Sequence, residues 1–295
     1  MFKNNIANFY KTDDGEQIYF LKNFDVIDEK KPVMVFNYGL VCSNHHWQFQ
    51  TEYFDELGYQ VVVHDYRGHF QSSGKDNLSK MNFTQMAKDV HDVCHFLGIK
   101  NAVMLGHSMG VNVCLQLAKD YPALVHSMVL ISGTFLPVKD VMFDSNVMEF
   151  IMPIVLMAKG KFPKVFDKIW ASASNPVIRK LIHHAGFNAH KVSEEFVDIY
   201  LNRVSQLGLP VFLQLFEEMT RQNIISCIDR MTMPSLIIGG HKDGVIPNHL
   251  QRTLATLLPN SKTYFLKDGS HVPQADFPQM VNDRIQLFIS QYPQV

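Results

Sequence analysis

A five-residue turn between a predicted strand and a predicted helix constrains this chain more than any other feature. Residues 102–105 form an apolar run that predicts a buried strand, and residues 111–119 carry apolar side chains at helical spacing. The turn between them is Gly106-His107-Ser108-Met109-Gly110. Because the bare pattern Gly-x-Ser-x-Gly arises by chance in about one chain of this length in ten, the flanking strand and helix carry the interpretation. Together they predict a turn that presents the serine hydroxyl as a nucleophile.

The spacing of the two glycines has a steric reason. In so tight a turn, a side chain two residues before or after Ser108 would collide with the neighbouring strand and helix, and Gly106 and Gly110 avoid this. The helix also directs free N–H groups and the positive end of its dipole to the place where an oxyanion would form. We therefore expect the backbone N–H of Met109 to be one oxyanion donor. We expect His107 to pack or hydrogen-bond behind the serine.

Two downstream loops contain the partners that a serine nucleophile needs. Asp243 follows the apolar run 234–240, at the strand end where sites in open α/β sheets are built. His271 lies in the loop after a second short strand, 262–266. The order serine, acid, histidine predicts that Ser108 attacks a carbonyl carbon, that His271 is the general base and that Asp243 orients the imidazole.

Several other polar residues are weighed against this assignment. Asp268 and Asp276 are rival acids, but the first is too close to His271 in sequence and the second follows it. Cys42 is expected to be a buried thiol. The candidate metal ligands are two histidine pairs, His45 with His46 and His183 with His184. Since no carboxylate or cysteine stands at ligand spacing from them, we expect no metal and interpret both pairs as structural or solvated.

Four motifs make the chain resemble the α/β-hydrolase superfamily, in particular its single-domain lipases, esterases and haloperoxidase-like hydrolases. They are GHSMG at 106–110, GGHKDGVIP at 239–247, DGSHVPQADFP at 268–278 and DYRGH at 65–69. The resemblance covers about residues 5–135 and 230–292. It implies catalysis without a cofactor, and it places the second oxyanion donor at the backbone N–H of Leu40, after Gly39. The chain departs from the family pattern at Tyr38, Phe70 and Val111, where the family usually has histidine, glycine and glycine.

Strands that alternate with helices predict an α/β fold. We expect a mostly parallel central sheet of about eight strands with helices on both faces, opened by a hairpin around residues 13–15. Residues 1–134 and 230–295 are expected to form this core. An α-helical cap, residues 135–229, would be inserted after the sixth strand, where the family commonly carries a lid over the site. The alternative is helical padding with no role as a lid.

These parts predict a serine hydrolase of the carboxylesterase or lipase type, acting through an acyl-enzyme on small esters with an apolar acyl chain. The same triad can also serve C–C bond hydrolysis, thioester hydrolysis or perhydrolysis, because fold and triad do not determine the substrate. Outside enzymes, the alternative is a small-ligand receptor that has lost turnover.

Composition agrees with this interpretation. A chain of 295 residues with 46% hydrophobic residues buries a large core, and its net charge of −1 gives no reason to expect nucleic acid as a partner. The first residues lack the apolar stretch of a secretory signal, and the four cysteines show no close spacing, so we expect reduced thiols in a cytoplasmic protein. Residues 159–170 interleave lysines with aromatic residues. We expect a solvated lysine face there, and contact with a membrane surface is the alternative.

Overall fold

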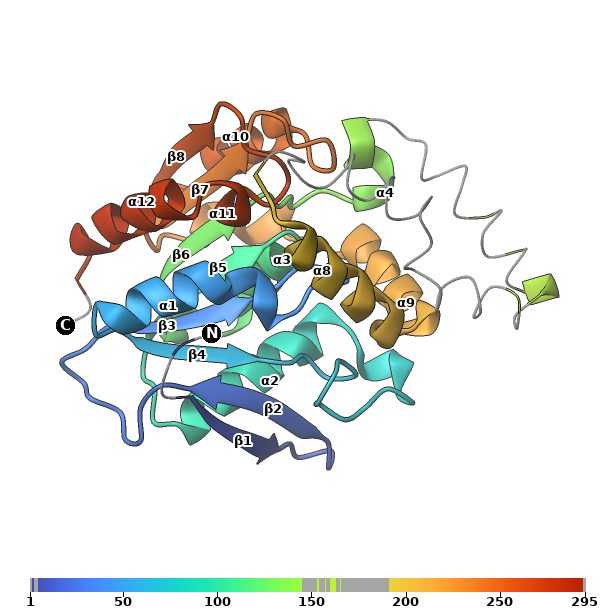
Figure 1. The fold of residues 1–295 in the computed structure, drawn as a ribbon, viewed down its shortest axis with the longest axis horizontal. Coiled ribbons are helices and arrows are strands. Elements are labelled where there is room, and N and C mark those ends of the chain that lie inside the picture. The colour runs from blue at the N-terminus through green and yellow to red at the C-terminus, as the bar shows by residue number, and fades with distance from the viewer. Residues whose placement is uncertain are drawn as a thin grey trace.

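The computed structural model describes residues 2, 5–144, 153, 157, 160–162, 165 and 191–293. Its centre is an eight-stranded sheet with the strand order β1-β2-β4-β3-β5-β6-β7-β8 (Figure 1). The strands are β1 (Ile6–Lys11), β2 (Gln17–Lys22), β3 (Val33–Asn37), β4 (Gln60–His64), β5 (Ala102–His107), β6 (Val125–Ile131), β7 (Ser235–Gly240) and β8 (Ser261–Leu266).

The sheet combines one antiparallel edge with a parallel body. Strand β2 pairs antiparallel with both β1 and β4, and each of the other neighbouring pairs is parallel. The predicted hairpin is β1–β2, whose turn contains Gly15 at a φ of 89°. All residues of β3, β4 and β5 are buried, which explains why these strands are almost continuous apolar runs in the sequence.

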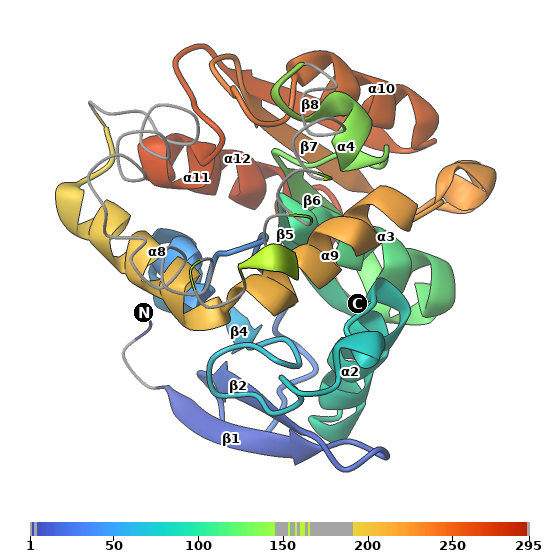
Figure 2. The same ribbon diagram turned by 90° about the vertical axis from the view of Figure 1, so that its right-hand side faces the viewer.

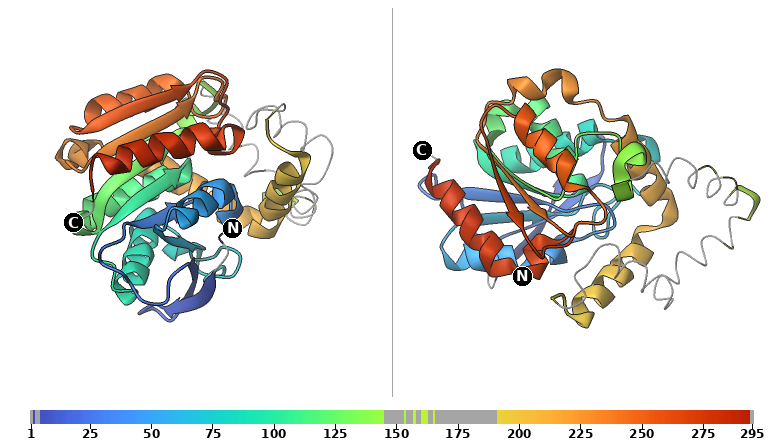
Figure 3. Two further views of the ribbon diagram at one scale, coloured as in Figure 1. Left: turned by 60° about the vertical axis from the view of Figure 1, so that its left-hand side comes forward. Right: turned by 90° about the horizontal axis from the view of Figure 1, so that it is seen from above.

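Helices cover both faces of this sheet. Seen from above in Figure 3, α1 and α12 lie on one side and α2 and α3 on the other. The α-helices of the described residues are α1 (Gln48–Glu56), α2 (Phe83–Phe96), α3 (Met109–Asp120), α4 (Val138–Val141), α8 (Glu194–Leu207), α9 (Leu209–Arg221), α10 (Asn248–Leu257), α11 (Pro273–Asp276) and α12 (Pro278–Ser290). Short 3₁₀ helices are η1 (Asn44–Trp47), η2 (Leu78–Lys80), η3 (Pro122–Leu124), η4 (Met142–Asp144) and η5 (Ile225–Arg230). The predicted α/β fold with about eight strands is thus confirmed.

Helix α8 belongs to the segment predicted to form the cap, and it packs beside the histidine loop. Its apolar side, which includes Phe196 and Val197, forms one buried cluster with Val272 and Ala275. Figure 2 shows α8 and α9 at the same end of the molecule as the start of α3. Most of residues 145–190, including the lysine-rich stretch, lies outside the described residues, so the boundaries of the cap and its role as a lid stay predictions.

Helix α9 is tied to the helix that follows the nucleophile. Gln222 follows the last residue of α9. Its side chain accepts a hydrogen bond from Asn112 Nδ2 at 2.7 Å and donates one to the Asn112 backbone carbonyl at 3.1 Å. Asn112 lies in the first turns of α3 and is buried. This paired amide contact holds α9 at the end of α3 that begins at Ser108.

A buried arginine joins three segments near the predicted site. Arg67 follows β4 and is 1% exposed. Its guanidinium donates to both carboxylate oxygens of Asp89 in α2, at 2.6 and 2.7 Å, and to Asp14 in the hairpin turn at 3.1 Å. Two parallel N–H···O bonds of this kind are strong and geometrically specific. Arg67 therefore connects the loop after β4 to a helix and to the antiparallel edge.

We expect Arg67→Met to lower the free energy of unfolding by about 3–5 kcal/mol, because Asp89 would be left buried without its partner. Urea denaturation at neutral pH measures this loss. Lys100→Met is the matched control. The Lys100–Glu29 ion pair is equally short, 2.6 Å, but both side chains are largely exposed, so its loss should cost at most about 1 kcal/mol. Equal midpoints of urea denaturation for the two variants would contradict the role given to Arg67.

Candidate active site

Ser108 lies in a strained turn between β5 and α3. Its backbone has φ 54° and ψ −119°, in the left-handed half of conformational space that a residue with a Cβ rarely adopts. A Cβ on Gly106 would lie 2.5 Å from the Gly110 carbonyl oxygen, and one on Gly110 would lie 2.1 Å from the Asn37 carbonyl oxygen in β3. These are the collisions with helix and strand that the Gly-x-Ser-x-Gly spacing predicts. Such strain persists only where the surroundings enforce it, and it is common at functional sites.

Asp243 and His271 meet at the carboxyl ends of β7 and β8. The His271 Nδ1 atom lies 3.1 Å from each carboxylate oxygen of Asp243. The Asp243 side chain is fully shielded from solvent, and that of His271 is 12% exposed. With its proton on Nδ1, donated to Asp243, the imidazole leaves Nε2 free to accept a proton.

The Asp243 carboxylate is itself held by neighbouring donors. The backbone N–H groups of Val245 and Ile246 donate to Oδ1, each at 2.9 Å. Gln251 in α10 donates to Oδ2 at 3.4 Å. These contacts oppose rotation of the carboxylate. The loop that follows β7 thus presents a carboxylate whose orientation is set before it meets the imidazole.

The two rival acids have other partners. Asp268 is at the surface and pairs with Lys242 at 2.8 Å. Asp276 is buried in α11 and accepts a hydrogen bond from the Ser270 N–H at 2.6 Å. Asp268 therefore ties the histidine loop to Lys242, and Asp276 binds the backbone of that loop, whereas Asp243 is the acid that contacts the imidazole of His271.

His107 connects the serine turn to the histidine loop. Its Nε2 atom lies 2.9 Å from the backbone carbonyl oxygen of His271, and the two rings are 5.1 Å apart. Since only an N–H can donate to a carbonyl, Nε2 carries the proton. Burial, and then the neighbouring His271, hold the pKa of His107 well below its usual range. A neutral His107 next to Ser108 places no positive charge beside the His271 ring.

The remaining histidines of this region are packing residues. His46 is buried against Phe196 and Tyr200 of α8, with ring centroids 5.2 and 5.4 Å apart. Burial lowers the pKa of His46 to about 3. Within the described residues, no group of three histidines, cysteines or carboxylates is placed to hold a metal. The pair His183–His184 lies outside the described residues.

The loop after β3 lies directly against the nucleophile. A Cβ on Gly39 would be 2.9 Å from the Ser108 Cβ. The Gly39 carbonyl accepts a hydrogen bond from the Cys42 N–H at 3.1 Å, so the trans peptide turns the Leu40 N–H away from Cys42. Among the described residues, no acceptor contacts the Leu40 N–H. Met109 is the first residue of α3, where the geometry of a helix leaves N–H groups free of intrahelical partners. Both predicted donors thus border Ser108.

The three departures from the family pattern have structural counterparts. Tyr38 is fully buried and packs on Tyr66, with ring centroids 4.6 Å apart. Phe70 keeps a positive φ of 35° although it carries a side chain, which explains why glycine is usual there. Val111 in α3 fills the space above Gly133, where an added Cβ would come within 2.3 Å of it. The larger residue in the helix is matched by a glycine after β6.

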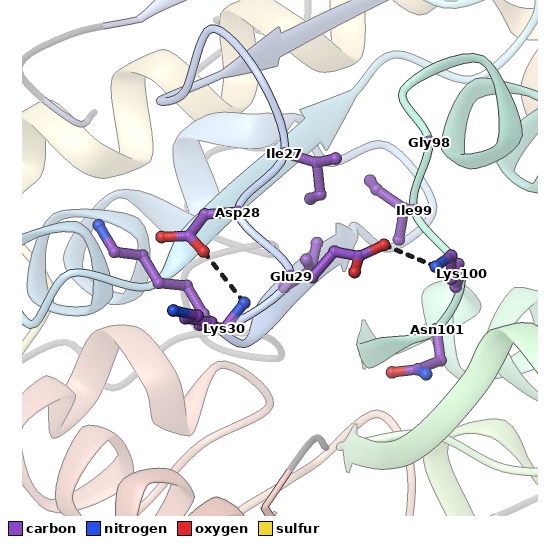
Figure 4. A pocket seen from close by; sticks show the side chains of 10 residues that line it. Ile27, Asp28, Glu29, Lys30, Gly98, Ile99, Lys100 and Asn101 are labelled. Atoms are coloured by element: carbon purple, nitrogen blue, oxygen red, sulfur yellow. Dashed lines mark hydrogen bonds and ion pairs between the residues drawn. The ribbon is translucent and has the colours of Figure 1, made fainter.

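The cavity drawn in Figure 4 lies at the opposite edge of the sheet. It measures about 380 Å³ and is lined by residues at the amino ends of β3 and β5, such as Ile99 and Asn101. The Glu29 and Lys100 side chains point toward each other across it. Its lining contains no serine, cysteine or histidine. The cavity is therefore separate from the turn of Ser108 and from the Asp243–His271 pair.

Two further properties bear on the sequence predictions. The four cysteines are free and buried, and burial raises the pKa of the Cys42 thiol to about 12, which keeps it protonated. In the described part of the chain, every helix is too short or too polar to cross a lipid bilayer.

The structure also reveals residues that sequence reasoning did not single out. Phe196 and Tyr200 contact His46 from α8, and the Tyr66 hydroxyl contacts the backbone of the loop after β3. Tyr66 stands inside the DYRGH motif, which was the one signal that pointed to it. For the two aromatic residues of α8, the sequence offers only helical periodicity.

Comparison with known proteins places this geometry in a family. A family model described as the alpha/beta hydrolase fold matches residues 32–278. Human protein ABHD8 is 25% identical over 262 residues, which cover 89% of this chain and 56% of ABHD8. Epoxide hydrolase 1 of Caenorhabditis elegans is 23% identical over 278 residues, which cover 90% of this chain and 66% of that enzyme. The chain thus spans between about half and two thirds of the length of these curated relatives.

The solved structures agree at the level of the fold. An esterase (EaEST) from Exiguobacterium antarcticum superposes with a TM-score of 0.75 at 17% identity, over 97% of this chain and all of that one. The matching family model includes the serine turn, the acid loop and the histidine loop. The chain therefore belongs to the alpha/beta hydrolase fold family.

Proposed function

We propose that this protein is a serine hydrolase that cleaves carboxylic esters with apolar acyl chains. The observation that carries the proposal is the buried Asp243–His271 pair, which joins the loop of the strained Ser108 through the His107 hydrogen bond. A nucleophile on a tight turn, an oriented base and free N–H groups are the parts that acyl transfer requires.

In the proposed reaction, His271 Nε2 takes the proton of Ser108 as the hydroxyl oxygen attacks the ester carbonyl carbon. Asp243 stabilises the imidazolium and keeps its Nδ1–H in place. The oxyanion of the tetrahedral intermediate accepts hydrogen bonds from the backbone N–H groups of Met109 and Leu40. His271 then protonates the alkoxide leaving group, and an acyl-enzyme remains on Ser108.

Water completes the cycle. His271 removes a proton from a water molecule, which attacks the acyl carbon, and the same proton returns to Ser108 as the acid departs. Each step moves one proton between oxygen and His271, so this chain's own residues supply the whole acid–base chemistry.

The comparisons support hydrolysis, and the kind of bond that is hydrolysed is left to be tested. One fold neighbour is titled an esterase, and one relative is named an epoxide hydrolase. Labelling with a fluorophosphonate tests the nucleophile directly, because only an activated serine reacts. The wild-type chain should be labelled and Ser108→Ala should not. A panel of p-nitrophenyl esters, an acyl thioester and styrene oxide then identifies the bond. Turnover of the epoxide alone, or no labelling at all, would refute ester hydrolysis.

The apolar surroundings of the site predict the preferred acyl group. Phe196 and Tyr200 of α8 face the loop of His46 beside the serine turn. Each CH₂ that leaves water contributes about 0.8 kcal/mol, or roughly a fourfold gain if it is fully expressed in the transition state. We expect kcat/KM to rise from acetate to medium-chain p-nitrophenyl esters and then to level off.

The chain offers a matched pair of variants for this prediction. Phe196→Ala should reduce the gain in kcat/KM per added acyl carbon. Phe96→Ala, at an exposed position at the end of α2, should leave this gain unchanged. A profile that is flat, or that falls steadily from acetate, would show that the acyl chain does not enter an apolar pocket.

A further inference from the structure

Two buried tyrosines hold each other next to the nucleophile. The Tyr66 N–H donates to the Tyr38 hydroxyl at 3.2 Å, and the Tyr66 hydroxyl donates to the Tyr38 backbone carbonyl at 3.1 Å. Tyr38 is 0% exposed and Tyr66 is 2% exposed. Because water does not reach these groups, each hydrogen bond lacks a ready substitute. We call this reciprocal arrangement the tyrosine clamp.

The clamp stands beside a buried carboxylate that is itself held in place. Asp65, the residue before Tyr66, is buried and accepts hydrogen bonds from the Asn44 side chain and from the Gln71 N–H, each at 3.2 Å. Asp65 and Tyr66 both follow β4 directly. The rigid end of a central strand therefore supports the clamp, and the clamp reaches across to the loop after β3.

The clamp and one backbone hydrogen bond together bind the first two carbonyls of this loop. The Tyr38 carbonyl is bound by the Tyr66 hydroxyl, and the Gly39 carbonyl is bound by the Cys42 N–H. In a trans peptide the N–H points opposite to the carbonyl. Each N–H therefore points away from the donor that binds the carbonyl of its own peptide. The Gly39 N–H points away from the Tyr66 hydroxyl, and the Leu40 N–H points away from Cys42. An oxyanion needs N–H groups and is repelled by carbonyl oxygens, so this orientation decides whether the loop can stabilise it.

The loop does not hold this conformation without support. Val41, two residues after Gly39, has a φ of 55°. A β-branched residue in the left-handed region is strained, at a cost on the order of 1–3 kcal/mol. A strained segment relaxes, by rotation of its peptides, unless its surroundings prevent it. The Tyr66 hydroxyl is a side-chain contact that opposes this rotation at the Tyr38–Gly39 peptide.

We propose that Tyr66 is a positioning residue for the oxyanion hole: its hydroxyl fixes the Tyr38–Gly39 peptide, and through it the direction in which the next peptide, Gly39–Leu40, presents its N–H to the developing oxyanion. This role deepens the ester hydrolysis proposed above and rests on it. Among the described residues, the hydrogen bonds of the Tyr66 N–H and hydroxyl go to Tyr38 and not to Ser108, Asp243 or His271. Its effect on the reaction passes entirely through the backbone of the loop.

Tyr66→Phe tests the proposal, since it removes the hydroxyl and keeps the ring. We expect kcat for the preferred p-nitrophenyl ester to fall by about 10- to 100-fold, less than the loss of a whole oxyanion donor, with KM changed by less than about threefold. The rate of labelling by a fluorophosphonate should fall in parallel. Tyr53→Phe is the control. It removes a hydroxyl that binds Gln286 at 2.6 Å, far from the site, and should keep wild-type kinetics.

A second variant separates the two hydroxyls of the clamp. Tyr38→Phe removes the acceptor of the Tyr66 N–H but leaves the Tyr38 carbonyl and the Tyr66 hydroxyl in place. It should reduce kcat less than Tyr66→Phe does. A larger loss in Tyr38→Phe, or wild-type kcat in a folded Tyr66→Phe, would overturn the proposal.

Hydrogen–deuterium exchange gives a readout that does not depend on turnover. Amides of the peptide spanning residues 37–42 should exchange faster in Tyr66→Phe than in the wild type, and at the wild-type rate in Tyr53→Phe. If the wild-type protein hydrolyses none of the esters, the proposed function is wrong. Hydrogen–deuterium exchange then tests on its own whether the Tyr66 hydroxyl holds the loop. Unchanged exchange in Tyr66→Phe would show that the hydroxyl does not hold the loop.

Discussion

Replacing Ser108 with alanine should lower kcat for ester hydrolysis by about a millionfold and leave the fold intact. The change removes the nucleophilic oxygen and little volume. Alanine keeps the Cβ of serine and adds no atom. It therefore creates no new collision in the turn between Gly106 and Gly110. Steady-state kinetics with the preferred ester, together with a melting curve, measure both halves of the prediction.

The partner of Ser108 gives a sharper form of this test. His271→Ala should lose nearly as much activity as Ser108→Ala, and the double variant should lose little more, because members of a triad act as a unit. Ser127→Ala is the control, since this buried serine of β6 lies outside the site. Substantial turnover by Ser108→Ala, with the control active, would refute the mechanism.

Asp243→Asn should lower kcat by about 10⁴-fold, through the wrong tautomer of His271. Two backbone N–H groups donate to Oδ1 of Asp243, so the amide oxygen of asparagine should take that place. Its NH₂ group then occupies the position of Oδ2 and faces Nδ1 of His271, 3.1 Å away. When Nδ1 accepts that hydrogen bond, the ring proton lies on Nε2, and this tautomer cannot act as the general base. The pH profile of kcat/KM and the rate of serine labelling both report this loss.

Asp276→Asn is the matched control for the acid. Its Oδ2 accepts a hydrogen bond from the Ser270 N–H, and an asparagine oxygen can accept the same bond. We expect most of the activity to remain, with a modest loss of stability. If Asp276→Asn were damaging and Asp243→Asn harmless, the assignment of the acid would be wrong.

Local patterns account for what could be predicted about the fold. Strands such as β5 and β7 were predicted from apolar runs, because burial on both faces leaves a strand few polar positions. Strand β1 is largely exposed, and the β1–β2 hairpin was predicted from its turn residues instead. Helix boundaries were less accurate. Apolar side chains at helical spacing predict a helix over residues 86–97. Helix α2 begins earlier, at Phe83, because the Asn82 side chain caps it by accepting a hydrogen bond from the Gln85 N–H at 2.8 Å. A single cap residue shifts the start of a helix while the apolar periodicity stays the same.

For the candidate site, the sequence contained the residue types and their order, and it did not contain their contacts. The serine turn is local, so two glycines and a serine predict it with its steric reason. The Asp243–His271 hydrogen bond could be expected because both residues end neighbouring strands of a parallel sheet. In each case a short pattern and a general rule of α/β sheets were sufficient.

The tertiary structure alone decided how these groups are held. The tyrosine clamp, the His107 bond to the His271 carbonyl and the packing of α8 on the histidine loop join segments far apart in the chain. No periodicity or spacing encodes such a contact, because each depends on where the folded strands place two side chains. The sequence by itself determined an α/β sheet with a serine turn and its partners. The folded chain determined the orientation of the carbonyls and imidazoles around them, since orientation is a property of the assembled packing.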